Sequence, residues 1–456
     1  MKDKIEAALK SSKADYTEIR LEEREVTTVS YRGADLENAG AIIDAGGIVR
    51  CMCKDGGWGV ATFNDRDDLI AKVEQAYQCA KVVQAEEPIE LAPIPVADDH
   101  LTVTLKHDFR GISLSEKKAL LEGYNAIVRG YSDKIVDTVV GYSDSFSRVH
   151  FANSEGAWIE EERPEVSLFT VAIARDGDNI QQGIESCAAQ EGFNFIQNRE
   201  ALAQTAARRA VELLSAETVV GGQYPVVINP TLAGVFIHEA FGHLSESDFI
   251  YENPKAREMM VLGRRFGQDI LNVFDNGAAP GLRGTHKYDD EGTPTRRNDL
   301  IKNGILVGRL HSRETAAKMG ESPTGNARAI TYRHAPIVRM TNTAIENGTT
   351  PFEDLIKDIK LGIYACDAYG GNTYLESFSF SSGYAYMIRD GQIAEMVKDV
   401  ILAGNLFTTL LNIDAIGNDF QWIQEGGGCG KGGQFPLPVA FGAPHVRIQN
   451  VVIGGE

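Results

Sequence analysis

This 456-residue sequence shows no segment that would carry the chain into or across a membrane. Its first twenty residues, MKDKIEAALKSSKADYTEIR, are typical of a charged amphipathic helix and lack the apolar core of a signal peptide. No run approaches the roughly 18 consecutive apolar residues that a membrane span requires. The six cysteines are scattered along the chain and form no dense disulfide framework. We therefore expect a cytoplasmic protein with reduced thiols and no membrane partner.

Basic residues are in deficit, with 45 Lys and Arg against 64 Asp and Glu, so the net charge is −19. This charge is spread along the chain, and it argues against nonspecific binding to nucleic acid or to anionic membranes. The apolar fraction of 43% is normal for a globular protein and gives no indication of disorder. At this length the chain should fold as two or three domains.

Two common catalytic signatures are absent. A Walker A phosphate loop at the glycine cluster near the C-terminus would need Gly at 425 and Ser or Thr at 432, where the chain has Glu425 and Gly432. No G-x-S-x-G turn is present either. These absences exclude nucleotide binding at that loop and leave serine hydrolysis without local support.

The element pattern predicts an α+β fold in three parts. Residues 1–100 are expected to form an N-terminal α+β domain with a first helix and long alternating strands. Residues 101–217 are expected to form a central α+β domain whose sheet is covered by helices on one face. Residues 218–456 are glycine-rich and strand-rich, which indicates a β-rich catalytic domain in which the helix that carries the motif below is nearly alone. The proline-rich segment 86–100 is the expected linker between the first two domains.

The most informative motif is the hexapeptide HEAFGH. Two imidazoles with a carboxylate beside the first are what a zinc hydrolase needs, which makes His238 and His243 candidate metal ligands and Glu239 a candidate base. Glu246 and Asp248 could orient the histidines as hydrogen-bond acceptors. The alternative interpretation is one buried, hydrogen-bonded histidine and one exposed histidine at a helix end.

A packed helix is expected to carry this motif. Residues 224–228 are typical of a buried strand, Asn229 can cap the helix that follows, and Pro230 suits its first position. In the familiar H-E-x-x-H motif the second histidine lies about 40° around the helix from the first, whereas the spacing of five found here gives about 140°. Both rings can reach one ion only if the helix ends, bulges or bends between them. Gly242 is the expected place, because glycine accepts backbone conformations that are costly to other residues.

Catalytic zinc usually takes three protein ligands, so the hexapeptide leaves one position to be filled from elsewhere. The candidates by residue type are His286, His311, His334, His445, Cys366, Cys429 and many carboxylates. Among them, His286 and His334 are expected to be structural. Cys429 has the most unusual surroundings, because glycines on both sides allow close approach of the backbone and Lys431 could favour the thiolate. On spacing alone, a cysteine in a flexible glycine loop is an equally good interpretation.

Two further polar segments admit more than one interpretation. Asn326, Arg328 and the segment 339–343 could hold a peptide substrate that adds as a strand to a sheet edge, or they could be ordinary turn and strand residues. For the acidic run at 289–291 we expect a solvated turn rather than a second metal site.

Four segments, in this order, resemble the TldD/PmbA family: HEAFGHLSESD, DDEGTP, MGESPTGNARAITYRHAPIVRMTNT and GGGCGKGGQ. The match covers the C-terminal half in detail and the N-terminal half more loosely. The resemblance implies a zinc-dependent metalloprotease with one Zn²⁺ per chain, held by His238, His243 and Cys429, with Glu239 as the base. Because every motif residue is retained, the chain resembles the catalytic TldD-type members rather than the PmbA-type (TldE) members that lack the zinc motif.

The resemblance also implies substrates and partners. Members act on small or unfolded polypeptides in the bacterial and archaeal cytoplasm, as a homodimer or as a heterodimer with a PmbA-like (TldE) subunit. The expected chemistry is hydrolysis by a metal-activated water, with Glu239 as general base that passes the proton to the leaving amine. Two alternatives stay open. One is a non-catalytic peptide-binding or scaffold subunit of such a complex, and the other is a zinc amidohydrolase of small molecules.

Overall fold

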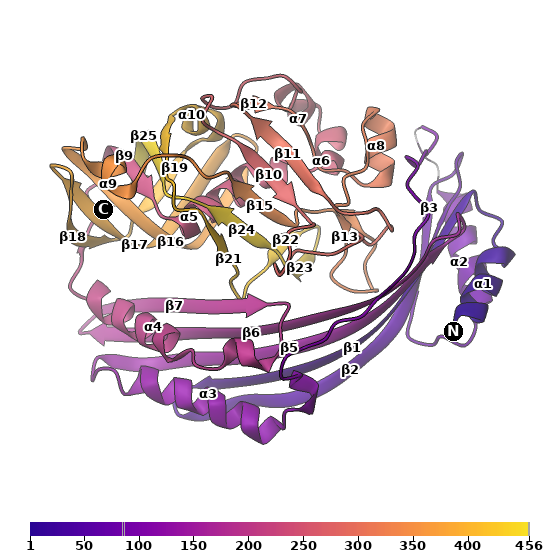
Figure 1. Cartoon of the computed structure of the whole chain (residues 1–456), viewed down its shortest axis with the longest axis horizontal. Coiled ribbons are helices and arrows are strands. Elements are labelled where there is room, and N and C mark those ends of the chain that lie inside the picture. Colours follow the sequence, from indigo (N-terminus) through magenta and orange to yellow (C-terminus); the bar gives the residue numbers. More distant parts are fainter. Residues whose placement is uncertain (84, 86, 455–456) are drawn as a thin grey trace.

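The computed structural model describes residues 1–83, 85 and 87–454. Its N-terminal half contains α1 (Lys2–Ser11), β1 (Tyr16–Arg32), β2 (Asp35–Met52), β3 (Trp58–Phe63), α2 (Leu69–Val82), β4 (Asp98–Leu101), α3 (Leu114–Arg129), β5 (Ile135–Asn153), β6 (Trp158–Asp176), β7 (Asn179–Ala189) and α4 (Glu200–Leu213). The strands form one seven-stranded sheet in the order β3-β2-β1-β5-β6-β4, with β7 also paired to β6. Figure 1 shows this sheet as a curved layer, with α3 and α4 on its outer face at one end and α1 and α2 at the other.

The long alternating strands expected near the N-terminus are β1 and β2. They pair antiparallel from Tyr16 and Met52 to the turn at Gly33, whose φ of 55° favours glycine. The central sheet is covered by helices on one face, as expected, because α3 packs on β5 and α4 packs on β6 and β7. Its other face is turned toward the C-terminal half of the chain (Figure 1).

The first two expected domains share this sheet. Strand β1 pairs antiparallel with β5 from Glu18 and Asn153 to Arg32 and Val139. The division of the chain at residues 100 and 217 stays our proposal. Residue 86 of the expected linker 86–100 lies outside the described residues. The rest of that segment is anchored, because the Ile89 amide donates to the Lys54 carbonyl and β4 pairs parallel with β6.

The C-terminal half is rich in strands, as expected. It contains β8 (Glu217–Thr218), β9 (Gly222–Ile228), α5 (Pro230–Ile237), α6 (Ser247–Glu252), α7 (Pro254–Met259), β10 (Val273–Asn276), β11 (Arg297–Lys302), β12 (Ile305–Leu306), α8 (Arg313–Met319), β13 (Ala327–Arg328), β14 (Ile337–Val338), β15 (Asn342–Ile345), α9 (Phe352–Ile356), β16 (Leu361–Tyr374), β17 (Ser377–Arg389), β18 (Gln392–Lys398), β19 (Ile401–Asn405), α10 (Leu406–Leu411), β20 (Ile413–Ile416), β21 (Gln421–Ile423), β22 (Cys429–Lys431), β23 (Gln434–Leu437), β24 (Ala440–Ala443) and β25 (Val446–Gly454). The expectation that one helix stands nearly alone was wrong, because this half also contains the helices α6 to α8 and α10. Each of these four helices has only six or seven residues. Helices of so few turns are too short to show a full apolar period in the sequence.

Two sheets enclose α5. One has six strands in the order β12-β11-β10-β15-β24-β21, and the other has eight strands, including β16, β9 and β25. Helix α5 packs against β15 and β24 of the first sheet and against β16 of the second. Its side chains Leu232, Phe236 and Ile237 are buried in the main hydrophobic core of this half. The helix that leads into the candidate site is therefore fixed on two sides, which is the rigid support that a metal site needs. The α+β architecture is confirmed.

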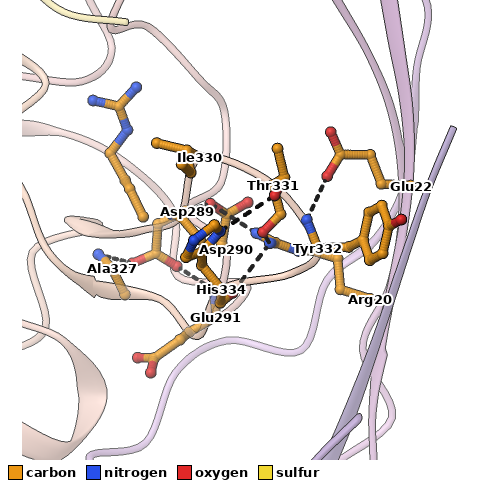
Figure 2. A network of polar contacts seen from close by, with 12 residues as sticks. Arg20, Glu22, Asp289, Asp290, Glu291, Ala327, Ile330, Thr331, Tyr332 and His334 are labelled. Atoms are coloured by element: carbon orange, nitrogen blue, oxygen red, sulfur yellow. Dashed lines mark hydrogen bonds and ion pairs between the residues drawn. The ribbon is translucent and has the colours of Figure 1, made fainter. Parts of the chain in front are cut away.

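The acidic run at 289–291 is buried against the N-terminal sheet, so the expectation of a solvated turn was wrong. Asp290 Oδ2 lies 3.1 Å from Arg20 Nη1 of β1, and Asp290 Oδ1 lies 3.0 Å from Arg163 Nη1 of β6. Glu291 accepts a hydrogen bond from Arg50 of β2. Figure 2 shows this loop and the segment around Tyr332 docked on β1. The arginines that neutralise these acids lie far away in the sequence, so local composition could not reveal their burial.

None of the described helices combines the length and the apolar character needed to cross a bilayer.

Candidate metal centre

The helix that leads to the HEAFGH motif begins as its sequence predicts. Strand β9 ends at Ile228, and the Asn229 side chain accepts a hydrogen bond from the Leu232 amide at 2.9 Å. Pro230 occupies the first helical turn, where its missing N–H costs nothing. The cap fixes where α5 starts and therefore where its C-terminal end presents the histidines.

The regular helix ends before the first histidine. Residues His238–Gly242 form a π turn in which the His243 amide donates to the His238 carbonyl, so the hydrogen bond spans five residues instead of four. Residues five apart thereby come to the same side, and the two imidazole centroids are 5.4 Å apart. The predicted bulge between the histidines is confirmed.

The reason that we gave for Gly242 was wrong. Its φ of −57° and ψ of −49° are ordinary helical values that any residue adopts. A Cβ atom at this position would instead overlap Met340 Sδ, and Met340 is completely buried. Glycine is needed here because a neighbouring segment packs directly on the π turn, and the sequence around residue 242 carries no signal of that contact.

Cys429 lies beside the two histidines. Its Sγ atom is 3.3 Å from His243 Nε2, and one ligand atom from each of His238, His243 and Cys429 lies within 4.8 Å of the other two. The thiol is held at the start of β22, which pairs antiparallel with β23. The other candidates for a third ligand are not part of this cluster, and His286, His311, His334, His445 and Cys366 lie elsewhere in the fold.

The donor set fits a zinc ion. His238 is only 3% exposed, and neither ring nitrogen has a hydrogen-bond partner among the described residues. Buried polar atoms in folded proteins almost always have a partner, so two orphaned nitrogens on one ring need a reason. Two imidazoles and one thiolate form a three-ligand set that zinc accepts in catalytic sites, with one position left for water or substrate.

Charges around the cluster favour the thiolate. Burial alone would raise the pKa of the Cys429 thiol, but the imidazoles of His238 and His243 outweigh it and lower this pKa to about 5. A thiolate is the form that binds a metal. Burial disfavours the imidazolium of His243, yet Glu246 and the Cys429 thiolate raise its pKa well above the usual value. Metal binding therefore competes with a proton on this ring.

Glu246 orients His243, as the sequence suggested. This carboxylate is 1% exposed, and its Oε2 atom lies 3.1 Å from His243 Nδ1 and 2.9 Å from Lys431 Nζ. Asp248, the other expected acceptor, contacts Lys431 Nζ at 2.6 Å and neither histidine. Lys431 thus neutralises two carboxylates behind His243.

Glu239 is the accessible member of the motif. Its side chain is 36% exposed, and its Oε2 atom lies 3.7 Å from His243 Nε2. It lines a cavity of about 330 Å³ together with His243, Lys431 and Tyr374. The carboxylate therefore stands where water and a bound substrate can reach it, next to the three candidate ligands.

Asn326 and the segment 339–343 belong to an internal network. Asn326 and the threonines at 341 and 343 are completely buried. All three donate hydrogen bonds to the Asp275 carboxylate. Strand β15 is paired on both sides, with β10 and with β24. The expectation that a peptide could add as a strand here was wrong for β15.

Sequence reasoning missed Arg283, which holds the loop before Cys429. Its guanidinium donates to the carbonyls of Glu425 and Gly427, the latter at 2.7 Å, and also pairs with Glu165 of β6. The N-terminal sheet is thereby connected to the loop that carries the thiol. An isolated arginine in a loop gives no sequence signal for this role.

Comparison with known proteins places these features in a family. The family models described as PmbA/TldA metallopeptidase domain 1, central domain and C-terminal domain match residues 17–80, 107–214 and 221–455. A metalloprotease of Synechocystis sp. is 50% identical over 446 residues, which cover 98% of this chain and 96% of the relative. A zinc metalloprotease TldD homolog of Saccharolobus solfataricus is 31% identical over 69% of this chain and 71% of its own length. The crystal structure of TldE from Thermococcus kodakarensis has the same fold, with a TM-score of 0.77 at 18% identity over 100% of both chains.

Proposed function

This chain belongs to the TldD/PmbA family of metallopeptidases, and we propose that it hydrolyses small or unfolded polypeptides with one zinc ion per chain. His238, His243 and Cys429 would hold the ion. The observation that carries the proposal is the pair of orphaned ring nitrogens of His238 beside the thiol of Cys429. Retention of all three potential ligands favours a catalytic subunit over a scaffold subunit.

In this proposal Glu239 is the general base. When bound, zinc supplies a Lewis acid that acidifies water and polarises a carbonyl. The exposed Glu239 carboxylate would accept a proton from the attacking water and deliver it to the leaving amine, which usually contributes about 10²–10⁴-fold to the rate. Glu246 would keep His243 in the orientation that directs Nε2 toward Cys429. Lys431 would keep the Glu246 carboxylate ionised.

Zinc analysis and peptide digestion test these roles. Cys429→Ser should lose zinc and turnover together, and Cys366→Ser, which changes a buried cysteine outside the cluster, should lose neither. Glu239→Gln should keep zinc and lose nearly all turnover. Full peptidase activity in Glu239→Gln would refute the base assignment, and full zinc content in Cys429→Ser would refute the ligand set.

The same assays separate the remaining functions. A peptidase cleaves an unfolded peptide and stops when a chelator is added. A non-catalytic peptide-binding subunit would show no turnover at any zinc content, and a small-molecule amidohydrolase would cleave small amides and leave peptides intact. We further propose a homodimer, or a heterodimer with a TldE-like subunit, in the cytoplasm. The fold shared with TldE is compatible with such a pair, and the mass of the purified complex would distinguish the two assemblies.

A further inference from the structure

A cavity of about 310 Å³ lies between the N-terminal sheet and the C-terminal half, outside the metal centre. Its walls come from strands β1, β5 and β6 on one side. On the other side they come from the loop near residues 283–290, from residues 328–330 at the end of β13, and from residues 436–438 at the end of β23. Gly426 and Gly427 also line it, and Gly427 is two residues from Cys429. Two residues of chain span at most about 7 Å, so the cavity reaches the immediate neighbourhood of the candidate metal site.

The sheet side of this cavity is polar. The residues that line it from the three strands are Arg20, Glu22, Arg24, Ser143, Ser145, Ser147, Arg163, Pro164, Glu165, Ser167 and Phe169. Alternate residues of a strand share one face, and a sheet face that packs against another layer is normally apolar. Here alternate positions of β1 and β5 carry guanidinium, carboxylate and hydroxyl groups. Such a face is suited to a polar ligand.

The carboxylates that line the cavity are already engaged within the protein. Asp290 pairs with Arg20 and Arg163, and Glu165 pairs with Arg283. The two remaining carboxylates accept hydrogen bonds from backbone amides (Figure 2). Glu22 accepts one from the Tyr332 amide. Asp289 accepts hydrogen bonds from the amides of Glu291, Thr293 and Ala327. The two carboxylates with an arginine partner, Asp290 and Glu165, are neutralised, and Glu22 and Asp289 each accept hydrogen bonds from backbone amides.

Arg24 and Arg328, in contrast, line the cavity without any carboxylate within 4.0 Å among the described residues. Arg328 donates to the carbonyls of Met340 and Pro438, and His286 lies beside it. Arg24 is less constrained. Within the described part of the chain, its side chain donates one hydrogen bond, to Ser145 Oγ at 3.3 Å, and its buried Nε atom has no partner. Arginine presents a planar fork of donors that matches a carboxylate, and a buried donor without a partner is costly.

We propose that this cavity binds a carboxylate of the peptide substrate and that Arg24 is its main anchor. The inference rests on the proposed peptidase function and adds a preference for peptides that bear a carboxylate a few residues from the bond to be cleaved. The carboxylate is either an acidic side chain or the C-terminus of the peptide. Arg328 supplies a second positive charge to the same space.

Binding to the chelator-treated, full-length protein tests the proposal without any need for turnover. Fluorescence anisotropy is measured with three labelled six-residue peptides of Ala and Ser: one with a free C-terminal carboxylate, one with a C-terminal amide, and one amidated peptide that contains a single Glu. The wild type should bind one or both carboxylate peptides about tenfold or more tightly than the neutral amide. The peptide that binds more tightly identifies the source of the carboxylate.

Arg24→Ala should abolish this preference and leave binding of the neutral peptide unchanged, and Arg24→Lys should keep part of it. Arg148→Ala is the matched control, because Arg148 lies next to Ser147 on the opposite face of β5, where it pairs with Glu25. An equal affinity of the wild type for all three peptides would overturn the proposal. So would an Arg24→Ala variant that keeps the preference while its thermal unfolding matches that of the wild type. A failure of the peptidase proposal would appear separately, as an absence of chelator-sensitive digestion.

Discussion

Gly242→Ala tests why the metal centre needs glycine at position 242. The reason is either the backbone conformation of that residue or its contact with Met340. The backbone at residue 242 is helical, so alanine fits its φ and ψ and would by itself gain about 0.5–1 kcal/mol over glycine. The new methyl group, however, would overlap Met340 Sδ in a closed core. Overpacking of this kind costs about 1–3 kcal/mol. We expect a net loss of about 0.5–2 kcal/mol in the free energy of unfolding.

The same substitution should disturb the metal site, because residue 243 follows directly. If the His243 ring moves by a few tenths of an ångström, zinc affinity should fall by about tenfold, which corresponds to about 1.4 kcal/mol. Urea unfolding of chelator-treated protein measures the first effect, and competitive zinc titration against a chromophoric chelator measures the second.

Met340→Ala provides the rescue. Alone it should cost about 2–5 kcal/mol by creating a cavity. Combined with Gly242→Ala it should restore zinc affinity, and the double variant should be more stable than the sum of the single effects predicts. Gly123→Ala is the matched control, because Gly123 lies in α3 with no atom within 4 Å of its Cβ position, so alanine should stabilise the protein. Strict additivity of the two effects, or normal zinc affinity in Gly242→Ala, would refute the reasoning.

Three further predictions concern the contacts between the two halves of the chain. Arg283→Ala should lower zinc affinity by about tenfold, because it releases the loop carbonyls before Cys429, and zinc titration measures this. Asp290→Ala should lower the free energy of unfolding by about 3–5 kcal/mol, because it leaves the buried Arg20 guanidinium without its carboxylate and removes one of the two carboxylates that pair with Arg163, and urea unfolding measures this. Burial, reinforced by the charges of nearby acids, raises the pKa of Glu425 to about 7, so the folded chain retains a proton that the unfolded chain releases above about pH 4.3. In chelator-treated protein, the wild type should therefore lose stability relative to Glu425→Gln as the pH rises from about 5 to about 7. The comparison of the two proteins isolates Glu425, because the lowered pKa of the Cys429 thiol by itself makes stability rise over the same range.

Each of these predictions has a result that contradicts it. Unchanged zinc affinity in Arg283→Ala would show that the loop holds its shape without the guanidinium. A decrease of less than about 1 kcal/mol in the free energy of unfolding of Asp290→Ala would mean that solvent screens these ion pairs. An identical pH profile in the Glu425→Gln variant would assign the slope between pH 5 and 7 to other groups.

Local structure was largely predictable because it depends on neighbours in the sequence. The cap at Asn229, the proline at position 230 and the apolar spacing that follows predicted α5 and the face that it buries. The alternation in β1 and β2 predicted a long antiparallel pair. Helices of five to seven residues were mostly missed, since one or two turns contain too few apolar positions to define a period.

The sequence alone determined that two histidines lie five residues apart with a carboxylate beside the first, and that a regular helix could not direct both rings to one ion. It also carried the motifs by which the family is recognised. Spacing alone left six candidates for the third ligand, the family resemblance implied Cys429, and the tertiary structure places the thiol of Cys429 beside the histidine pair. It also decided that Met340 requires glycine at 242 and that arginines of the N-terminal sheet bury the acids at 289–291. These outcomes depend on contacts between segments far apart in the chain, and such contacts are set by packing and charge pairing, which local composition does not encode.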